Sequence, residues 1–342
     1  MHQATIDAIW NHLKGTDLTL GLSKADLSLL PSTGLAHDHI RIGQETGWLA
    51  RVPKQSQWER PAQDNLTYQA ACFQRVGDTR AGPFMRQVIP VSDALPFGAL
   101  IVAYVEGRPS VLPDDLPLIA ECLAKIHAAP LPQDLAPLED HKDPVIPALA
   151  EIRTQLSYLD KLDLPQEQAD WIRSKVHWLA TLSWPETSIQ TLCGTDTHPG
   201  NFLIRGDMAV MVDLEKCLYG NPAIDLAHTS VYTSTTWEQS GTAILTPDQV
   251  VDFYETHLEL LPPELETALR PWLWPMRWLL YLRAITWCCK YLAEQNRQGS
   301  GWSNAKNQAS TVDHLTGRTI HYLNAETLSF IETEMAQLRF ES

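Results

Sequence analysis

Residues 196–230 read DTHPGNFLIRGDMAVMVDLEKCLYGNPAIDLAHTS, and this stretch decides the fold. Asp196 and Asn201 lie five positions apart on a predicted loop between strands, and Asp213 follows the apolar run AVMV. Because two strand ends can direct three oxygen-bearing side chains toward one point, we expect the three to converge. Phosphoryl transfer from a nucleotide needs these groups: a carboxylate to orient and deprotonate an acceptor hydroxyl, and oxygen ligands to hold Mg²⁺ on the phosphates. The alternative is that each is an ordinary turn residue, since Asp and Asn favour turns.

The order Asp-x₄-Asn, strand, Asp is that of a kinase catalytic loop followed by its metal-binding aspartate. The segments DTHPGNFLI and VMVDLEKCLYGNPAIDLAHTS resemble DxHPGNxL and IDWExAxxGDPAxDLA of the aminoglycoside phosphotransferase and choline kinase family, which has a protein-kinase-like fold. Elsewhere the resemblance is weaker but the elements agree in order. WLARVPK is similar to the family's YxLRxP, IVAYVEGRP to its hinge strand ending in EGRP, and AECLAKIHAAPLP to its LAxLHxxP helix.

The rest of the chain divides into a β-rich and a helical part. From about residue 25 to 105, five β-type runs alternate with turn signals, and the stretch 65–76 predicts a helix that ends at Gly77. Beyond this part helical patterns dominate, including one last helix after Asn304. With the resemblance, this predicts an α+β, bilobal protein-kinase-like fold. Residues 1–106 would form the N-terminal nucleotide-binding lobe, a five-stranded antiparallel sheet with one main helix and a leading helix. Residues 107–342 would form a mostly helical C-terminal lobe that carries the catalytic loop and an acceptor-binding subdomain.

The resemblance also implies roles for single residues. Asp196 would be the catalytic base, and Asn201 and Asp213 the Mg²⁺ ligands. Arg51, with Lys54 as the alternative, would reach the nucleotide phosphates from the third strand. The adenine would hydrogen-bond the backbone of a hinge that contains Val102, Ala103, Tyr104 and Glu106. The backbone N–H groups of a loop would face the phosphates, and this loop contains Ser32, Thr33 and Gly34.

Two departures from the family pattern motivate an alternative function. The His-Gly pair usual before the catalytic aspartate reads Gly194-Thr195 here. The helix after the third strand offers Gln69 and Gln74 where the family has a glutamate that pairs with the strand's cation. The alternative is a non-catalytic nucleotide-binding pseudokinase or regulatory module. The three retained oxygen donors oppose it.

Three further polar residues of the same stretch have open or structural interpretations. Asp225 is expected to tie the catalytic loop to the start of a helix, and His198 to fix the loop rather than to catalyse. Glu215 stands two residues beyond Asp213, so on an extended strand it shares that residue's face. Either a role in the metal shell or at the acceptor, or a plain salt bridge, would suit it.

Charge and composition bound the partners. With 26 Lys and Arg against 41 Asp and Glu, the net charge of −15 argues against nucleic acid or an anionic membrane as the main partner. The most apolar stretch, residues 271–292, is interrupted by Arg277, Arg283 and Lys290, so no membrane span is expected. The six cysteines form no CxxC pair or zinc spacing and suggest reduced thiols in a cytoplasmic protein.

The excess negative charge belongs to the predicted helical lobe. Residues 1–106 carry 9 basic and 10 acidic side chains, so 17 basic and 31 acidic ones remain for residues 107–342. These are solvated helix faces or, alternatively, an acidic cleft that attracts a cationic substrate. We therefore predict a small-molecule kinase that transfers the γ-phosphoryl group of ATP or GTP to a hydroxyl of a small acceptor. Aminoglycosides and amino alcohols fit the acidic lobe, and a sugar would suit the same scaffold. The sequence leaves the nucleotide, the acceptor and the oligomeric state open.

Overall fold

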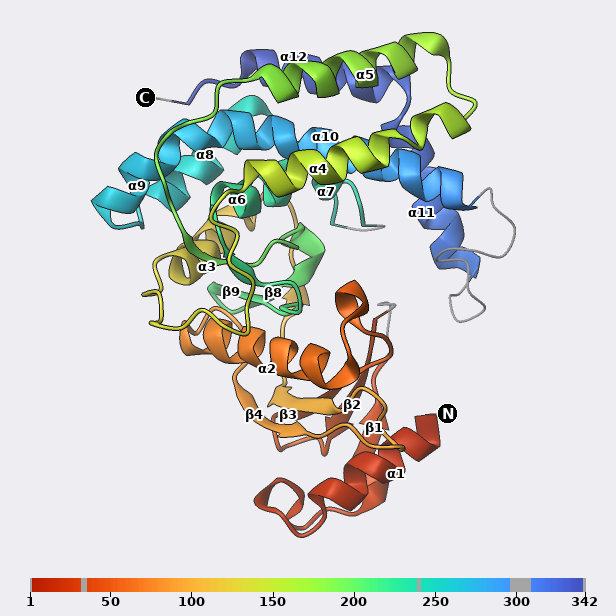
Figure 1. Ribbon diagram of the computed structural model, residues 1–342. Coiled ribbons are helices and arrows are strands. Elements are labelled where there is room, and N and C mark those ends of the chain that lie inside the picture. Colours follow the sequence, from red (N-terminus) through yellow and green to blue (C-terminus); the bar gives the residue numbers. More distant parts are fainter. Residues whose placement is uncertain (1, 32–35, 239–240, 296–308, 341–342) are drawn as a thin grey trace.

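The computed structural model describes residues 2–31, 36–238, 241–295 and 309–340. A sheet flanked by two helices forms one end of the molecule, and helices form the other end (Figure 1). The sheet has the order β1-β2-β3-β5-β4 with antiparallel neighbours throughout, which confirms the predicted five-stranded antiparallel sheet. Its strands are β1 (Leu27–Leu29), β2 (His37–Ile42), β3 (Trp48–Pro53), β4 (Met85–Ile89) and β5 (Ala99–Ala103).

The helix after the third strand is longer than its predicted range. Helix α2 (Ala62–Asp78) begins directly after Pro61 and continues through Gly77. The expectation that Gly77 ends the helix is wrong. A Cβ at Gly77 would lie 3.1 Å from the carbonyl oxygen of Pro83, so this glycine permits a close backbone approach instead.

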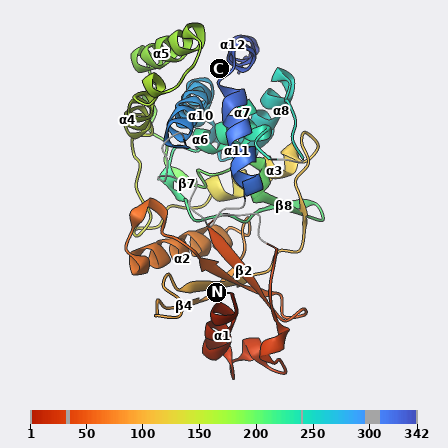
Figure 2. The ribbon, with the colours of Figure 1, turned by 90° about the vertical axis from the view of Figure 1, so that its right-hand side faces the viewer.

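Alternation of side chains along β5 builds a core on each face of the sheet. Ala99 and Ile101 lie in a cluster with the leading helix α1 (His2–Leu13), whereas Leu100 and Val102 lie in the main core with α2. Helix α2 covers the face nearer the helical end, and α1 lies on the far side (Figure 2). Side chains on the α2 face are therefore the ones that can reach the second half of the chain.

The second half of the chain is mainly helical, as predicted. Its helices are α3 (Leu116–His127), α4 (Val145–Leu156), α5 (Gln166–Thr181), α6 (Ala223–Ser230), α7 (Tyr232–Thr235), α8 (Pro247–Leu258), α9 (Pro263–Leu269), α10 (Leu273–Gln295), α11 (Ala309–Tyr322) and α12 (Ala325–Gln337). Two helices, α11 and α12, replace the single predicted last helix. The break occurs at Asn324, whose side chain accepts the Thr327 N–H at 2.7 Å and so starts a new helix.

Two small sheets lie between the five-stranded sheet and the helices (Figure 1). One pairs β7 (Thr191–Cys193) with β10 (Leu218–Gly220), and the other has the order β6-β8-β9. The hairpin of β8 (Phe202–Arg205) and β9 (Met208–Met211) turns at Gly206, whose φ of 62° is available to glycine at no steric cost. Strand β6 (Arg108–Pro109) pairs with β8, so the chain has entered the second half by residue 108.

Within the described ranges, no helix combines the length and the apolar character needed to cross a membrane. Helix α10 has 23 residues, and Arg277 lies fully buried within it. Its guanidinium is paired with Glu334 at 2.7 Å. The six cysteines are all buried and free.

Candidate active site

The predicted catalytic aspartate lies on the loop that joins β7 to β8. Its Oδ2 atom lies 2.6 Å from Nζ of Lys216, and the Asp196 side chain is 22% exposed. The backbone carbonyl of Asp196 accepts a 2.8 Å hydrogen bond from Nδ2 of Asn201. Asp196 therefore has its backbone held from within the loop and its carboxylate paired with a cation from the segment after β9.

The β8–β9 hairpin brings Asn201 and Asp213 to the same end. Asn201 directly precedes β8, and its carbonyl accepts the Val212 N–H at 2.9 Å. Asp213 comes after β9, the strand that pairs with β8, so it lies at the same end of the hairpin as Asn201. Because Nδ2 of Asn201 donates to Asp196, its Oδ1 is left as an acceptor. One carboxylate oxygen of Asp213 faces Arg51. The Asp213 side chain as a whole is 35% exposed. This pair of oxygen donors fits the ligand chemistry of Mg²⁺.

Arg51 reaches this end from β3. Its Nη2 atom lies 2.5 Å from Oδ1 of Asp213, 3.2 Å from Oε2 of Glu215 and 3.1 Å from Nδ1 of His37. Nε2 of His37 lies 2.9 Å from the same Glu215 oxygen. We call these four residues the Arg51 cluster. The side chains of Arg51, His37 and Glu215 are each 4% exposed, so this is a buried pairing.

The strand geometry explains why His37 and Arg51 meet. Ile40 and Ile42 of β2 and Ala50 of β3 point into the α1 side of the sheet, so His37 and Arg51 point to the α2 face. The Arg51 guanidinium also lies 5.3 Å from the ring centroid of Phe73 in α2. Arg51 is thereby directed out of the sheet toward the hairpin end.

The carboxylate that pairs with Arg51 comes from Glu215 and not from α2. Gln69 of α2 lies 3.3 Å from His37, and Gln74 donates to Asp78 on the exposed side of the helix. Of the two interpretations for Glu215, the structure shows the salt bridge, and its partner is Arg51. A carboxylate from another segment therefore pairs with Arg51 in place of a helix glutamate.

The charges around the two aspartates favour their ionised forms. Burial raises the pKa of Asp196, but its surroundings, above all the Lys216 ammonium, lower it further than burial raises it. The pKa of this carboxyl consequently lies below its ordinary value. Burial also raises the pKa of Asp213, and Arg51 more than offsets this, so the pKa of Asp213 is lowered as well.

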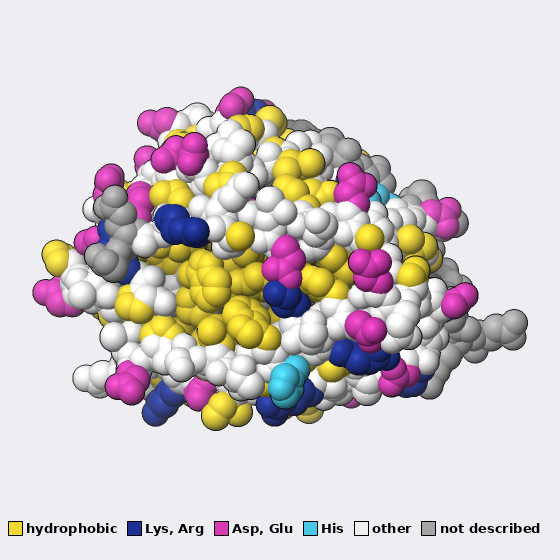
Figure 3. Space-filling view, turned by 90° about the horizontal axis from the view of Figure 1, so that it is seen from above, with side chains coloured by type: hydrophobic (Ala, Val, Ile, Leu, Met, Phe, Trp, Pro, Cys, Tyr) yellow, Lys and Arg dark blue, Asp and Glu magenta, His cyan; other side chains and the backbone are white. Residues whose placement is uncertain are grey.

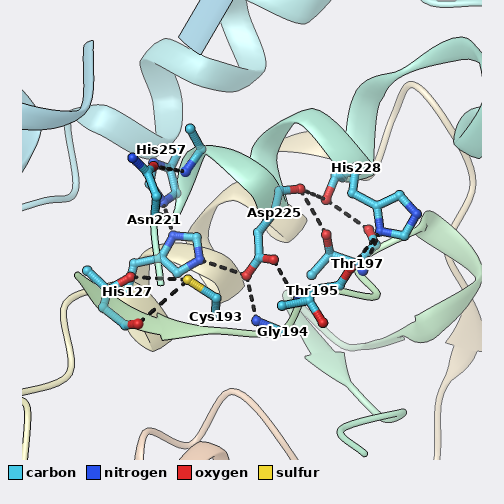
Figure 4. A network of polar contacts seen from close by, with 12 residues as sticks. His127, Cys193, Gly194, Thr195, Thr197, Asn221, Asp225, His228 and His257 are labelled. Atoms are coloured by element: carbon cyan, nitrogen blue, oxygen red, sulfur yellow. Dashed lines mark hydrogen bonds and ion pairs between the residues drawn. The ribbon is translucent and has the colours of Figure 1, made fainter. Parts of the chain in front are cut away.

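A second network holds the backbone of the predicted catalytic loop (Figure 4). The two carboxylate oxygens of Asp225, at the start of α6, accept the N–H groups of Gly194 and Thr195 at 2.6 and 2.7 Å. The Asp225 side chain is fully buried. This confirms the expectation that Asp225 ties the loop to the start of a helix.

Two buried histidines continue this network behind Asp225. Nε2 of His127, in α3, lies 3.0 Å from Asp225, and its Nδ1 lies 2.8 Å from Nε2 of His257 in α8. Burial, together with His127, holds the pKa of His257 well below its ordinary value. Because a carboxylate oxygen only accepts, His127 donates from Nε2 to Asp225, and its Nδ1 shares a hydrogen bond with Nε2 of His257. We call Asp225, Gly194, Thr195, His127 and His257 the Asp225 network.

Two groups of side chains in the described part of the chain have metal-ligand spacing, and neither fits a metal well. His37, Asp213 and Glu215 form one group, but the Arg51 guanidinium already occupies the position between them. His127, Cys193 and Asp225 form the other, but both oxygens of Asp225 are used by backbone donors. Burial also raises the pKa of the Cys193 thiol well above its ordinary value. Asn201 and Asp213 remain the better pair.

The other predicted nucleotide contacts lie apart from these networks. Lys54 lies 3.5 Å from Asp38 and is not in the Arg51 cluster. In the hinge, Val102 pairs within the sheet, and the N–H groups of Ala103 and Tyr104 donate to Phe84 and Gly47. Glu106 is exposed. Ser32, Thr33 and Gly34 lie outside the described residues.

Three residues that contact the predicted site escaped the sequence interpretation. His37, Lys216 and His127 lie in ordinary strand, turn and helix patterns, and each contacts a site residue. A sequence signal was available for His37, because side chains alternate between the two faces of a strand. This alternation places His37 on the same face of the sheet as the cation of the neighbouring strand. No local signal distinguishes Lys216 or His127, because their partners are 20 and 98 positions away.

The helical end away from β8 and β9 has an apolar surface of its own. Figure 3 views this end and shows apolar side chains gathered among scattered charged ones. A hollow of about 1090 Å³ is lined by Trp274, Met335, Phe340 and neighbours at α9, α10 and α12. The Arg270 guanidinium at its edge is already paired with Glu255 and Glu266. The hollow holds none of the predicted catalytic groups.

Comparison with known proteins gives a family for the chain. The model of the phosphotransferase enzyme family (APH) matches residues 41–269, which include the Asp225 network and all of the Arg51 cluster except His37. No curated protein sequence matches the chain.

Solved structures share the whole fold at low sequence identity. A choline/ethanolamine kinase family protein from Mesorhizobium loti has a TM-score of 0.59 and 17% identity, over 97% of this chain and 98% of its own. Choline kinase from Cryptosporidium parvum has a TM-score of 0.63 and 10% identity, over 98% of each chain. A spectinomycin phosphotransferase, in complex with ADP and spectinomycin, has a TM-score of 0.57 and 13% identity, over 91% of this chain and 93% of its own. The kinase-like fold predicted from the sequence is confirmed.

Proposed function

This chain belongs to the phosphotransferase enzyme family, and we propose that it transfers the γ-phosphoryl group of ATP to a hydroxyl of a small molecule, with Asp196 as base. As a member of this family the chain is an ATP-dependent phosphotransferase that acts on hydroxyl groups. The observation that carries the assignment of residues is the convergence of Asp196, Asn201 and Asp213 around the β8–β9 hairpin, with cations paired to both carboxylates.

Each of the three residues has a separate task in this proposal. Asp196, kept ionised by its surroundings, accepts the hydrogen of the acceptor hydroxyl and orients its oxygen toward the phosphorus. Oδ1 of Asn201 and a carboxylate oxygen of Asp213 would hold Mg²⁺, which when bound neutralises charge on the phosphates. Arg51, positioned by Glu215 and His37, adds positive charge at the same side of the site.

The nucleotide would lie between the two parts of the chain. We place the boundary of the lobes at residues 106 and 107, because β5 belongs to the sheet and β6 already pairs with β8. The adenine would face the hinge backbone near Glu106, since the N–H groups of Ala103 and Tyr104 are used within the sheet. The loop with Ser32, Thr33 and Gly34 would cover the phosphates, as the family resemblance implies.

The acceptor class is proposed from charge. The helical lobe carries 17 basic and 31 acidic side chains, so a cationic acceptor such as an aminoglycoside or an amino alcohol suits it better than an anionic one. The names of the structural neighbours, which include choline kinase and spectinomycin phosphotransferase, support acceptors of this kind. A sugar remains the neutral candidate. The buried free cysteines support the proposed cytoplasmic location.

The pseudokinase alternative loses both of its motivations. Glu215 supplies the carboxylate that α2 lacks, and Asp225 holds the N–H groups of Gly194 and Thr195. The three oxygen donors of the proposed site, Asp196, Asn201 and Asp213, are also all present. These contacts support the enzyme.

The test uses two variants and two measurements. Asp196→Asn should bind Mg-ATP with nearly unchanged affinity in calorimetry but lose at least about a thousandfold in turnover, because only the base is removed. Asp213→Asn should instead lose the Mg²⁺ dependence of ATP binding. Turnover is scored by ADP release across a panel of aminoglycosides, amino alcohols and sugars. Binding without turnover on the whole panel would favour the pseudokinase, and wild-type turnover by Asp196→Asn would refute its role as base.

A further inference from the structure

Lys216 is a charged residue in contact with the proposed base to which the reaction described above gives no task. Its Nζ atom lies 2.6 Å from Oδ2 of Asp196, and its side chain is 36% exposed. Among the described residues, Asp196 is the partner with which its ammonium forms a hydrogen bond or ion pair. An ammonium has three donors, so the contact with Asp196 leaves two of them for another acceptor.

The backbone of Lys216 is attached to the loop of Asp196 by Thr195, which stands where the family pattern has a glycine. Oγ1 of Thr195 donates a 2.8 Å hydrogen bond to the carbonyl of Lys216. Thr195 adopts a φ of 59°, a left-handed conformation that disfavours a β-branched side chain. At this position the strained threonine supplies a hydroxyl that glycine would lack. The loop that carries the base therefore also fixes the base's cation.

Distances place the Lys216 ammonium near the transferring group. A general base lies about 2.6–3.2 Å from the oxygen whose proton it accepts. In a reactive complex that oxygen lies about 3–3.5 Å from the phosphorus. A flexible lysine side chain whose ammonium contacts the Asp196 carboxylate can therefore also reach the oxygens of the γ-phosphoryl group.

Arg51 cannot take this place without breaking its own contacts. Its guanidinium is 4% exposed and is held between Asp213, Glu215 and His37. Moving it toward Asp196 would take the guanidinium away from the buried Glu215 carboxylate, which is costly. Of the two cations, Lys216 is the more exposed one and the one in contact with the base.

We propose that Lys216 is a catalytic residue whose ammonium binds the γ-phosphoryl oxygens of ATP while it keeps hold of Asp196, an assignment that rests on the proposed function. In the step, the acceptor oxygen bonds to the γ-phosphorus as the bond to the β,γ-bridging oxygen breaks. The electron pair of that bond stays on ADP, and the hydroxyl proton passes to Asp196 and then to solvent. Lys216 transfers no proton; it neutralises charge on the equatorial oxygens throughout.

The experiment compares nucleotides that differ in the γ-phosphate. Calorimetry gives the Kd of Mg-ADP and of the non-hydrolysable analogue Mg-AMP-PNP for wild type and Lys216→Met. Loss of a charge-assisted hydrogen bond should weaken AMP-PNP about tenfold or more and ADP by less than about twofold. Lys216→Arg should retain part of the preference for AMP-PNP. Lys142→Met is the matched control, because that side chain is 81% exposed and lies outside the site.

A double variant separates contact from mere neutralisation of Asp196. If Lys216 acted only by cancelling the charge of Asp196, Asp196→Asn combined with Lys216→Met would restore wild-type AMP-PNP affinity. Contact with the phosphate instead predicts that the double variant stays as weak as Lys216→Met, while Asp196→Asn alone binds as tightly as wild type.

The outcomes distinguish this inference from the function on which it rests. Wild-type protein that binds neither nucleotide would overturn the proposed function itself. Normal binding by wild type with an unchanged AMP-PNP to ADP ratio in Lys216→Met would overturn the role of Lys216 alone. Faster turnover, scored as ADP release, by Lys216→Met than by wild type would also overturn the role of Lys216, because it would mean that Lys216 blocks the base.

Discussion

The Arg51 cluster and the Asp225 network both position the site, but the first pairs side chains with side chains and the second pairs a side chain with backbone groups. In the Arg51 cluster, polar and charged side chains from β2, β3 and the segment after β9 face one another, and Asp213 is still 35% exposed. In the Asp225 network one fully buried carboxylate faces backbone N–H groups. Charged partners can be exchanged when a nucleotide and its metal arrive, whereas backbone donors cannot find a second acceptor. The first network is therefore suited to binding and the second to holding the loop rigid.

The largest effect should come from the Asp225 network. Asp225→Ala leaves the N–H groups of Gly194 and Thr195 and the imidazole of His127 without an acceptor. We expect a loss of about 4 kcal/mol in the free energy of unfolding, since each unsatisfied buried group costs about 1–3 kcal/mol. Urea unfolding measures it. Asp252→Ala, at an exposed position of α8, is the control and should change little. A loss as small as the control's would show that the loop does not depend on Asp225.

The Arg51 cluster should respond more weakly in stability and more strongly in binding. Glu215→Gln removes one charge but keeps the shape, so Arg51 retains Asp213 and His37. We expect a loss of about 2 kcal/mol in the free energy of unfolding and a several-fold weaker Mg-ATP affinity. A double-mutant cycle with Arg51→Met measures the coupling. Strictly additive effects would contradict the pairing that the structure shows.

Acid should destabilise the protein through its buried histidines. Burial lowers the pKa of His228 to about 4, and burial with Arg51 does the same for His39. Below about pH 6.5 the unfolded chain binds protons at these residues, but the folded chain does so only near pH 4. The free energy of unfolding should therefore fall by about 1 kcal/mol per histidine between pH 7 and 5.5.

The measurement is urea unfolding at several pH values across that window. His228→Gln should remove its share of the pH dependence, whereas the exposed His12→Gln should leave the slope as it is. An identical slope in wild type and His228→Gln would mean that His228 is not buried as a neutral group.

The smallest effect should appear at Thr195. Thr195→Gly removes the hydrogen bond to the Lys216 carbonyl but relieves the left-handed backbone, so stability should change by less than about 1 kcal/mol. Thr195→Val keeps the strain and loses the bond, and should be the less stable of the two. Thr195→Ser, which keeps the hydroxyl, should resemble wild type. Thermal unfolding of the three variants checks the order, and equal stability of the valine and serine forms would contradict it.

Much of the site was predictable because its residues are close in sequence. The loop from Asp196 to Asn201 and the strand that leads to Asp213 form one local hairpin, so alternation and turn residues were enough to bring them together. The partner of Arg51 was not predictable, since Glu215 is 164 positions away and replaces a glutamate expected on α2. The fold shows the same limit at Asn324. One last helix was predicted there, but the Asn324 side chain caps the start of a second helix.

The sequence by itself determined the five-stranded sheet, the helical second half and the three oxygen donors of the hairpin, because side-chain periodicity and turn chemistry act over a few residues. Only the tertiary structure decided which polar groups pair with each other. Arg51 pairs with Glu215, Lys216 with Asp196 and His127 with Asp225 across 164, 20 and 98 positions. Such pairs depend on burial and on distances of about 3 Å between chain segments, which no local pattern of residues specifies.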